Sequence, residues 1–251
     1  MTSYEELKNR IIATDPSELS YSAISEKLST ASALARVSSN QIFVIDHHKQ
    51  KFLFLENRPL FTQIPIEYVS KVGFDFYRTD LFDKSEKDRA HMIHLAVLRF
   101  MSDLAFGEML DYSVCYSLTF KNIYGRPQII YHQQMPFLLS PSGKLWLSIC
   151  SVTTGSIAQK ENLMIICHQL GRRFSFDWSK KEWIQQQTID LKPEELFVLQ
   201  YAVMGEPISQ IADKMCKSVD SIKSYRRSIF LKLGVNNITE AITFAKNTRL
   251  I

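Results

Sequence analysis

The sequence predicts an α+β protein: an N-terminal five-stranded antiparallel sheet with flanking helices, followed by an all-α C-terminal domain of four helices. Two patterns carry this prediction. Up to about residue 177, short apolar runs typical of strands alternate with turn residues and a few helical stretches. After Gln185–Gln187, the expected linker, every segment has a helical pattern. The length of 251 residues and the 45% hydrophobic content are ordinary for a globular chain and leave room for two domains.

Charge, cysteine usage and the first residues argue against several classes of protein. A net charge of +4 is by itself weak support for a polyanionic partner. Four dispersed cysteines show neither CxxC nor Cys/His spacing, so we expect reduced thiols in a cytoplasmic protein and no metal site: Cys115, Cys150, Cys167 and Cys216. Residues 1–7 lack the pattern of a secretory signal, and no stretch approaches the ~18–20 apolar residues that span a bilayer. We therefore expect no membrane association.

The first helical region is expected between Tyr4 and Val37. Asp15 followed by Pro16, with Glu18 three positions after the cap, has the composition of a helix start. The apolar positions that follow share one helical face: Leu19, Ile24, Leu28, Ala31 and Ala35. This stripe either packs on its own domain or contacts a second copy of the chain, and the sequence leaves both open.

Five strands are expected in the N-terminal part. The first two, 42–45 and 52–55, form a hairpin around a polar turn. A helix over 86–109 follows, and then come three strands separated by turn residues: 112–120, 128–139 and 144–153. Residues 163–167 and 173–177 predict a final hairpin.

The order of strand pair, short helices, longer helix and three antiparallel strands carries a resemblance to a known family. The residues involved are Ile42–Asp46, Phe52–Glu56, Gly73–Tyr77 and Asp88. Residues 38–155 resemble a PAS domain, which implies a sensor module with a five-stranded sheet and a hollow of ligand size. The ligand and any cofactor are unknown from the sequence.

The region from Leu191 to Ile251 predicts four helices without reference to any family. The boundaries come from cap and turn residues: Pro193, Gly205–Pro207, Ser218, Gly234, and the pair Asn237 and Glu240. The third helix, 219–233, has Ile222, Ile229 and Leu233 facing inward. Two short helices joined by a tight turn, the second polar and basic outward, form a helix-turn-helix.

Charge is sorted within this region. Residues 188–220 carry three Lys against six Asp and Glu, a net of −3, whereas residues 221–251 carry six Lys and Arg against one Glu, a net of +5. Such sorting favours a cationic face where phosphates would lie. Taken alone, a basic helix is explained as well by a solvated surface.

The motif over 191–251 is more specific than the charge. Its positions are Leu191, Glu195, Val198, Leu199, Gly205, Ile211, Ala212, Ser218, Val219, Ile222, Lys223, Ile229, Lys232, Leu233, Gly234, Val235, Asn237, Thr239, Glu240 and Ala241. With this spacing the region resembles the LuxR-type (GerE-like) helix-turn-helix. It departs from the family pattern at Lys192 (usually Thr), Pro207 (usually Ser) and Tyr225 (commonly His). The first two put the helix starts in doubt, although Pro207 can serve in a first turn.

The resemblance implies a third helix that enters the major groove of duplex DNA. Since Ile222 and Ile229 must face inward, we expect Lys223, Ser224 and Arg227 to contact base edges. The expected phosphate contacts are Ser221, Arg226 and Lys232. A helix-capping role explains Ser221 equally well, and a salt bridge or a free surface charge explains Arg226 equally well.

The family usually dimerises and reads two half-sites, so we expect a homodimer. The last helix, around 239–246, is the usual contact. Its apolar face here would be formed by Ala241, Ile242 and Ala245.

Other front domains are alternatives to a PAS-like sensor. A phospho-receiver needs acidic residues near its first strand, whereas the early acidic residues here precede helical segments. An acyl-homoserine-lactone receptor usually carries its tryptophans in the first half, whereas this chain has Trp146, Trp178 and Trp183. A third alternative, a front domain that only dimerises or docks a protein, stays open.

Two further hypotheses concern chemistry in the N-terminal part. His91 and His94 lie on the expected helix and could ligate haem, but packing or surface roles are favoured. The sequence shows no nucleophile–base spacing, glycine-rich phosphate loop or paired carboxylates, so we expect no enzyme.

The sequence therefore predicts a cytoplasmic DNA-binding transcription regulator that is controlled by its front domain. Its partners would be double-stranded DNA, a second copy of the chain and, in the PAS-like domain, a small molecule. The expected regions are a helical segment 1–37, a PAS-like domain 38–155, a hairpin and linker 156–187, and a helix-turn-helix domain 188–251.

Overall fold

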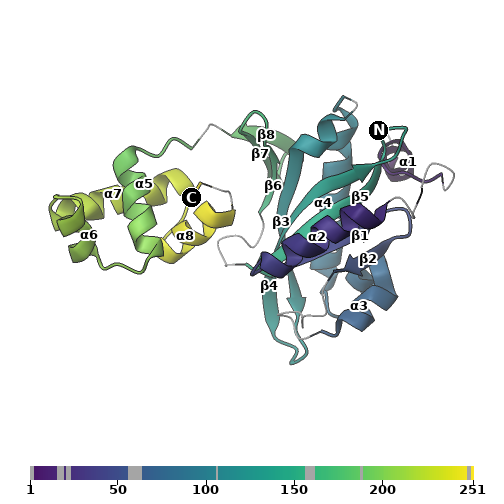
Figure 1. Cartoon of the computed structure of the whole chain (residues 1–251), viewed down its shortest axis with the longest axis horizontal. Coiled ribbons are helices and arrows are strands. Elements are labelled where there is room, and N and C mark those ends of the chain that lie inside the picture. Colours follow the sequence, from purple (N-terminus) through teal and green to yellow (C-terminus); the bar gives the residue numbers. More distant parts are fainter. Residues whose placement is uncertain are drawn as a thin grey trace. The chain divides into compact units, whose positions relative to one another are not determined.

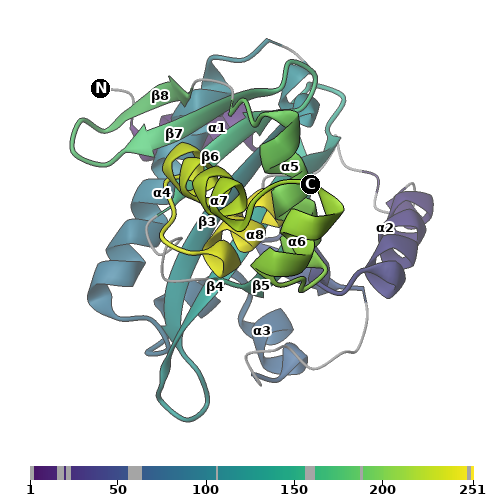
Figure 2. The ribbon, with the colours of Figure 1, turned by 90° about the vertical axis from the view of Figure 1, so that its left-hand side faces the viewer.

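The computed structural model describes residues 3–15, 20, 24–55, 64–105, 107–155, 162–186, 189–247 and 250–251. The chain forms two compact units, Met1–Gln186 and Gln187–Ile251, and each unit has its own hydrophobic core (Figures 1 and 2). The linker prediction was partly wrong, because Gln185 and Gln186 belong to the last strand of the first unit. Gln187 lies outside the described residues.

The first unit is built on one antiparallel sheet of eight strands in the order β2-β1-β5-β4-β3-β6-β7-β8 (Figure 1). The strands are β1 Gln41–Asp46, β2 Lys51–Phe54, β3 Tyr112–Lys121, β4 Pro127–Leu139, β5 Leu145–Thr154, β6 Leu163–Cys167, β7 Arg172–Asp177 and β8 Glu182–Gln186. Every strand pair is antiparallel, and the central β3–β4 register opposes Tyr116 to His132.

The expected count of five strands was too low. The five expected strands form a contiguous block, β2-β1-β5-β4-β3, and β6 continues the sheet from β3. Leu163 and Ile165 of β6 are buried in the same core as the first five strands. At the far edge, Trp183 of β8 packs on Phe100 and donates a hydrogen bond from Nε1 to the Ala96 carbonyl at 3.2 Å. The expected final hairpin is formed by β6 and β7, and the additional strand β8, which the sequence did not predict, continues the same sheet.

Helices cover both faces of this sheet (Figure 1). They are α1 Tyr4–Ile11, α2 Ser25–Val37, α3 Ile66–Val72, the 3-10 helix η3 Gly73–Arg78, α4 Lys84–Ser102 and the 3-10 helix η4 Glu108–Asp111. The expected helix over 86–109 therefore ends early, at Ser102, and Met109 belongs to a separate short turn. The larger core lies between the sheet and α1, α3 and α4.

The opposite face of the sheet is covered by α2. Ile24, Ala31 and Ala35 are buried, and the first two pack with Val44 and Trp146 in a second cluster. The apolar stripe of this helix thus packs on its own unit along these residues, while Leu34 and Val37 remain exposed. The expected helix start at Pro16–Glu18, together with Leu19, lies outside the described residues.

The second unit contains four helices, as the sequence predicts. They are α5 Pro193–Val203, α6 Ile208–Lys214, α7 Val219–Leu233 and α8 Ile238–Asn247. Their shared core holds Val198, Leu199, Ile211, Ile222, Ile229, Leu233 and the small residues Ala212, Ala241 and Ala245. Figure 2 shows the four helices of this unit. Among the described residues, no helix is long and apolar enough to cross a membrane.

Candidate nucleic-acid interface

The start of α7 is defined by a serine cap. Ser218 precedes the helix with an extended backbone, and its Oγ accepts a hydrogen bond from the Ser221 backbone N–H at 3.1 Å. This is the cap that the sequence predicts. Gly234 ends the helix at φ 65° and ψ 37°, a left-handed conformation that favours glycine. Cap and stop confine α7 to the fifteen residues Val219–Leu233.

The inward face of α7 is apolar and its outward face is polar. Ile222, Ile229 and Leu233 are buried, as expected. Lys223, Ser224 and Arg227 are exposed on the outward face. Within a helix, positions three and four apart lie on the same side. Arg227 is three residues after Ser224 and four after Lys223, so the structure brings the three expected base-contact residues together on one accessible stripe.

An acidic residue lies beside this stripe. Asp220 is 89% exposed in its side chain, and its Oδ1 is 3.1 Å from the Lys223 Nζ. The pair is a surface i,i+3 contact of small stabilisation, so Lys223 can exchange it for another acceptor at little cost. The i,i+3 spacing of Asp220 and Lys223 is a signal for this pair in the sequence.

The expected phosphate contacts have three different environments. Ser221 takes part in the capping arrangement, with its Oγ 2.9 Å from the Ser218 Oγ. Arg226 is partly buried, and its guanidinium carbon lies 5.9 Å from the centroid of the Phe230 ring. Lys232 is bound within the unit, as described next. Ser221 and Arg226 are both partly exposed.

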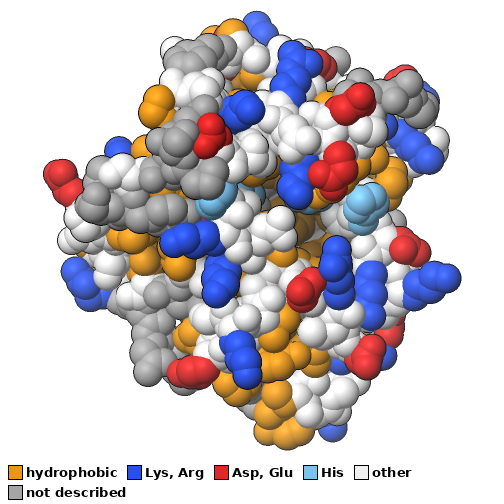
Figure 3. Space-filling model, turned by 90° about the vertical axis from the view of Figure 1, so that its right-hand side faces the viewer, with side chains coloured by type: hydrophobic (Ala, Val, Ile, Leu, Met, Phe, Trp, Pro, Cys, Tyr) orange, Lys and Arg blue, Asp and Glu red, His pale blue; other side chains and the backbone are white. Residues whose placement is uncertain are grey.

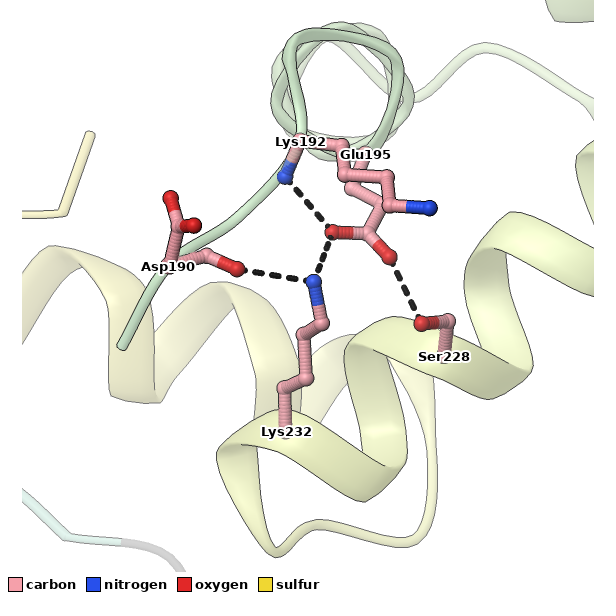
Figure 4. A network of polar contacts seen from close by, with 5 residues as sticks. All are labelled: Asp190, Lys192, Glu195, Ser228 and Lys232. Atoms are coloured by element: carbon pink, nitrogen blue, oxygen red, sulfur yellow. Dashed lines mark hydrogen bonds and ion pairs between the residues drawn. The ribbon is translucent and has the colours of Figure 1, made fainter. Parts of the chain in front are cut away.

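Lys232 belongs to a network around a buried carboxylate (Figure 4). Glu195 is only 1% exposed. Its Oε1 accepts a hydrogen bond from Ser228 Oγ at 2.6 Å, and its Oε2 accepts from the Lys232 Nζ at 2.7 Å and from the Lys192 backbone N–H at 2.7 Å. The Lys232 Nζ also donates to the Asp190 carbonyl at 2.7 Å. The network joins the segment before α5, the first turn of α5 and the last two turns of α7.

The network also sets the charge state of Glu195. Burial alone would raise the pKa of this carboxyl, but the hydrogen bonds from Lys232, Ser228 and the Lys192 N–H outweigh it and lower the pKa below its usual value. Glu195 is therefore an anion that is held by its partners. In the sequence Glu195 stands out only as a family position, since its side-chain partners Ser228 and Lys232 lie more than thirty residues away along the chain.

The two unusual helix starts are accommodated differently. Lys192 has no side-chain acceptor with which to cap α5, but the Glu195 carboxylate accepts from its backbone N–H. Pro207 is the cap residue of α6 and not part of its first turn, so that expectation was wrong by one position. Tyr225 is partly buried against the core of the unit. All helices of the motif form despite these departures.

The expected dimer residues are mostly internal. Ala241 and Ala245 are 0% exposed and belong to the core of the second unit, so their side chains are not available to a partner. Ile242 is partly exposed. Small residues at these two positions let α8 approach α5 and α7 closely. The helix begins as expected, with Asn237 Oδ1 accepting from the Glu240 N–H at 2.9 Å.

Surface charge elsewhere is mixed. On the face of the molecule drawn in Figure 3, the described Lys and Arg side chains are interspersed with Asp and Glu. This agrees with the small net charge of +4. The one-sided charge of residues 221–251 is therefore a local feature of the chain.

The interior of the first unit contains several buried polar side chains. The Tyr116 ring stacks on the His132 ring, with centroids 4.7 Å apart and an interplanar angle of 3°. The His132 Nδ1 lies 3.8 Å from the Cys150 Sγ, and its Nε2 has no hydrogen-bond partner among the described residues. Burial lowers the pKa of His132 to about 3, so the ring is neutral. His47 is likewise buried, with its Nε2 2.8 Å from the Ser148 Oγ.

The two histidines of α4 pack against α1. Tyr4 lies with its ring 5.3 Å from His91 and 5.6 Å from His94, and its hydroxyl is 3.1 Å from the His94 Nδ1. These contacts support the packing interpretation of both histidines. Among the described residues, no group of three or more His, Cys, Asp and Glu side chains could hold a metal ion.

Comparison with known proteins identifies the second unit. Residues 191–245 match the family model of bacterial regulatory proteins of the luxR family. The Fimbriae Z proteins of Escherichia coli K12 and O157:H7 are each 36% identical to this chain over 61 residues. The matched part covers 24% of this chain and 29% of each relative. The likeness to these proteins is therefore confined to one domain.

The similarity of this chain to solved structures is weak. Vibrio cholerae VqmA, a LuxR-type receptor, shares 16% identity over 62% of this chain and 64% of its own, with a TM-score of 0.25. A phage VqmA in complex with DPO shares 13% identity over 89% of this chain and 90% of its own, with a TM-score of 0.30. TM-scores this low do not establish a common overall fold. What the sequence match and the helix geometry establish together is that the C-terminal part of this chain is a LuxR-family helix-turn-helix domain.

Proposed function

We propose that this protein is a transcription regulator that binds duplex DNA through α7 and is controlled by its N-terminal unit. One observation carries the proposal: in a LuxR-family domain, α7 presents Lys223, Ser224 and Arg227 together on an exposed stripe. A helix of this width fits the major groove, where each base pair has its own pattern of donors and acceptors.

Base contacts are assigned to this stripe by chemistry. Lys223 and Arg227 carry donors that match the O6 and N7 acceptors of guanine, and the small Ser224 lets the helix approach the bases. The Asp220 carboxylate, 3.1 Å from Lys223, is displaced from that lysine when a base takes its place. Ser221 and Arg226 are proposed phosphate contacts, which fix the register of α7 on the duplex without reading sequence.

The proposal includes a homodimer. One recognition helix covers only a few base pairs, and two copies related by a two-fold axis read two half-sites. With Ala241 and Ala245 inside the core, the contact on α8 is assigned to Ile242 and the exposed positions beside it.

The N-terminal unit is proposed to be a PAS-like sensor, with the expected regions 1–37, 38–155 and 156–187 as its parts. Two features support this. The strands β1–β5 occur in the element order on which the resemblance rests and lie next to one another in the sheet. The interior between sheet and α4 holds neutral polar groups, including an unpartnered His132 Nε2, that suit a small uncharged ligand. An event there would change the spacing of the two recognition helices.

The test of DNA binding is selection of bound duplexes from a random pool by the wild-type chain and by Arg227→Ala in parallel. The wild type is expected to enrich a two-fold-related site. Arg227→Ala is expected to relax that site at one base pair per half-site, with about 1–3 kcal/mol less discrimination there. Arg226→Gln is the matched comparison. It should weaken binding to all DNA sequences alike and reduce the salt dependence of the affinity by about one phosphate contact.

Failure to enrich any sequence would contradict the proposal if residues 188–251 alone also enriched none. If that fragment did enrich a site, the N-terminal unit would be holding the DNA-binding unit inactive without its signal. The sensor role is tested separately by native mass spectrometry of the purified chain. A bound small molecule supports sensing, whereas a chain that is free of ligand in every preparation favours a front unit that only dimerises or docks a protein.

A further inference from the structure

The strongest unused feature of the second unit is the network of Glu195, Ser228 and Lys232 (Figure 4). It ties α7 to the first turn of α5 at two positions one helical turn apart, with contacts of 2.6 Å and 2.7 Å. Both positions lie on the flank of α7 that faces α5, away from the stripe that carries Arg227. The network therefore fixes the rotation and height of α7 without occupying its outward face.

The same lysine reaches the chain that enters the unit. Asp190 belongs to the segment between the first unit and α5, and its carbonyl accepts from the Lys232 Nζ at 2.7 Å. One ammonium thus holds the incoming segment and the buried Glu195 carboxylate at once. A change in the direction of that segment would be transmitted to the C-terminal half of α7 through a contact that involves no intervening residue.

These contacts would have to break before the Lys232 ammonium could bind a DNA phosphate. To reach a phosphate, the ammonium would have to leave Glu195, which is 1% exposed and would then be a buried charge without its cation. The Lys232 side chain is also only 31% exposed. By contrast, Lys223 would leave only the solvent-exposed Asp220 carboxylate if it bound DNA.

We propose that Lys232 and Glu195 are positioning residues that align α7 for base recognition and couple it to the segment entering from the N-terminal unit. This inference rests on the proposed DNA-binding function. It assigns Lys232 a role inside the protein in place of the phosphate contact that the sequence suggested. Ser228 holds the second oxygen of Glu195 and so keeps the carboxylate from rotating away from the lysine.

The experiment compares full-length wild type with Glu195→Gln, Lys232→Gln and the double variant, and with Lys180→Gln as an exposed lysine control in the first unit. Affinity is measured by fluorescence anisotropy over a series of KCl concentrations. The two probes are the duplex that the wild type enriches and a random duplex of equal length. If neither the wild type nor residues 188–251 alone enriches a duplex, the proposed function itself fails before any variant is made.

We expect each single variant to lose about 3- to 30-fold in affinity for the enriched duplex relative to the random one. The salt slope for the random duplex should stay at the wild-type value. The double variant should bind the enriched duplex no more weakly than the single variant with the lower affinity, because the two residues act as a unit. Lys180→Gln should bind as wild type.

Two results would overturn the proposal. In one, Lys232→Gln alone lowers the salt slope by about 0.9 while Glu195→Gln does not, which identifies a phosphate contact. In the other, both duplexes lose affinity equally and the unit melts at the assay temperature, which identifies a purely structural role.

Coupling is read separately by hydrogen exchange of the unliganded chains. We expect Lys232→Gln to speed amide exchange in residues 189–192 and in the last turn of α7 together, while exchange in α6 is unchanged. Faster exchange confined to α7 would refute the coupling.

Discussion

At the scale of single residues, the assignment of side chains on α8 separates core from surface. Ala241 and Ala245 have no exposed surface, whereas Ile242 between them is partly exposed. On an amphipathic helix, neighbours in sequence point in different directions, so one apolar run can serve two purposes. A dimer contact on this helix must use the side that bears Ile242.

Substitutions on α8 should therefore have opposite consequences. Ala241→Glu buries an unpaired carboxylate and is expected to lower the free energy of unfolding of the second unit by about 3–5 kcal/mol. Ile242→Gln should cost about 1 kcal/mol and shift the chain from dimer to monomer. Far-UV circular dichroism during urea denaturation measures the first effect, and sedimentation velocity measures the second. Thr239→Gln, exposed on the same helix, is the control. A folded, monomeric Ala241→Glu variant would contradict this assignment.

At the scale of elements, the turn between α6 and α7 contains a strained position. Cys216 has φ 51°, in the left-handed region of backbone conformation. Residues other than Gly and Asn adopt this region at an energetic cost. The turn is closed by hydrogen bonds from the Cys216 N–H to the Asp213 carbonyl at 3.1 Å and from the Lys217 N–H to the Ala212 carbonyl at 2.9 Å. The position of α7 relative to α6 requires this backbone conformation.

Cys216→Gly is expected to stabilise the second unit by about 0.5–1 kcal/mol, because relief of the left-handed strain exceeds the added entropy of the unfolded chain. Cys216→Val should destabilise it by about 1–2 kcal/mol, because a β-branched side chain worsens the strain. The matched control is Lys217→Gly at the next position, where glycine brings only the entropy cost and should be destabilising. Urea denaturation of each variant is the measurement, and a less stable Cys216→Gly would argue against this turn geometry.

At the scale of the whole molecule, the two units should respond differently to acid. All six histidines precede Gln187. Three of them have lowered pKa values: the buried His47 and His132 and the partly buried His94. Burial lowers the pKa of His47 and His132 to about 3 and the pKa of His94 to about 4. The neighbouring His94 lowers the pKa of His47 further. His91 and Lys8 do the same for His94. Below pH 6.5 the unfolded chain binds protons at these positions while the folded unit does not. The first unit must then lose stability as the pH falls from 6.5 toward 4.

Each of these histidines contributes up to about 1.4 kcal/mol per pH unit in that window. The second unit has no histidine, and its Glu195 pKa is lowered, so its stabilisation by Glu195 is lost only below the unfolded value of 4.5. All three tryptophans lie in the first unit, so their fluorescence reports its unfolding alone. We expect the fluorescence midpoint in urea to fall between pH 7 and pH 5, while the α-helical signal of fragment 188–251 changes little.

A matched variant tests the origin of this acid response. His132→Phe keeps a ring that can stack on Tyr116 but cannot bind a proton. As the pH falls, the free energy of unfolding of this variant should decrease less steeply than that of the wild type. The difference in slope should be the contribution of one histidine, up to about 1.4 kcal/mol per pH unit. An unchanged slope would mean that His132 is protonated in the folded unit.

Local signals were sufficient for the second unit and for most strands. Ser218, Gly234 and the pair Asn237 and Glu240 act on neighbours within four residues, so sequence alone placed the bounds of α7 at 219–233 and the start of α8. The stripe of Lys223, Ser224 and Arg227 followed from helical period once Ile222 was placed inside. The number of strands did not follow, because β8 is anchored by Trp183 on α4, far away in the chain.

The amino-acid sequence by itself thus determined the bounds of α7, the start of α8 and which side of α7 is polar. It could not decide which polar residue is free to act. Lys232 and Arg227 are equally basic in the sequence, and only the packing of α5 against α7 pairs the lysine with Glu195 while leaving the arginine exposed. The reason is range: caps and helical period act within a turn or two, whereas pairing and burial depend on which distant segments meet.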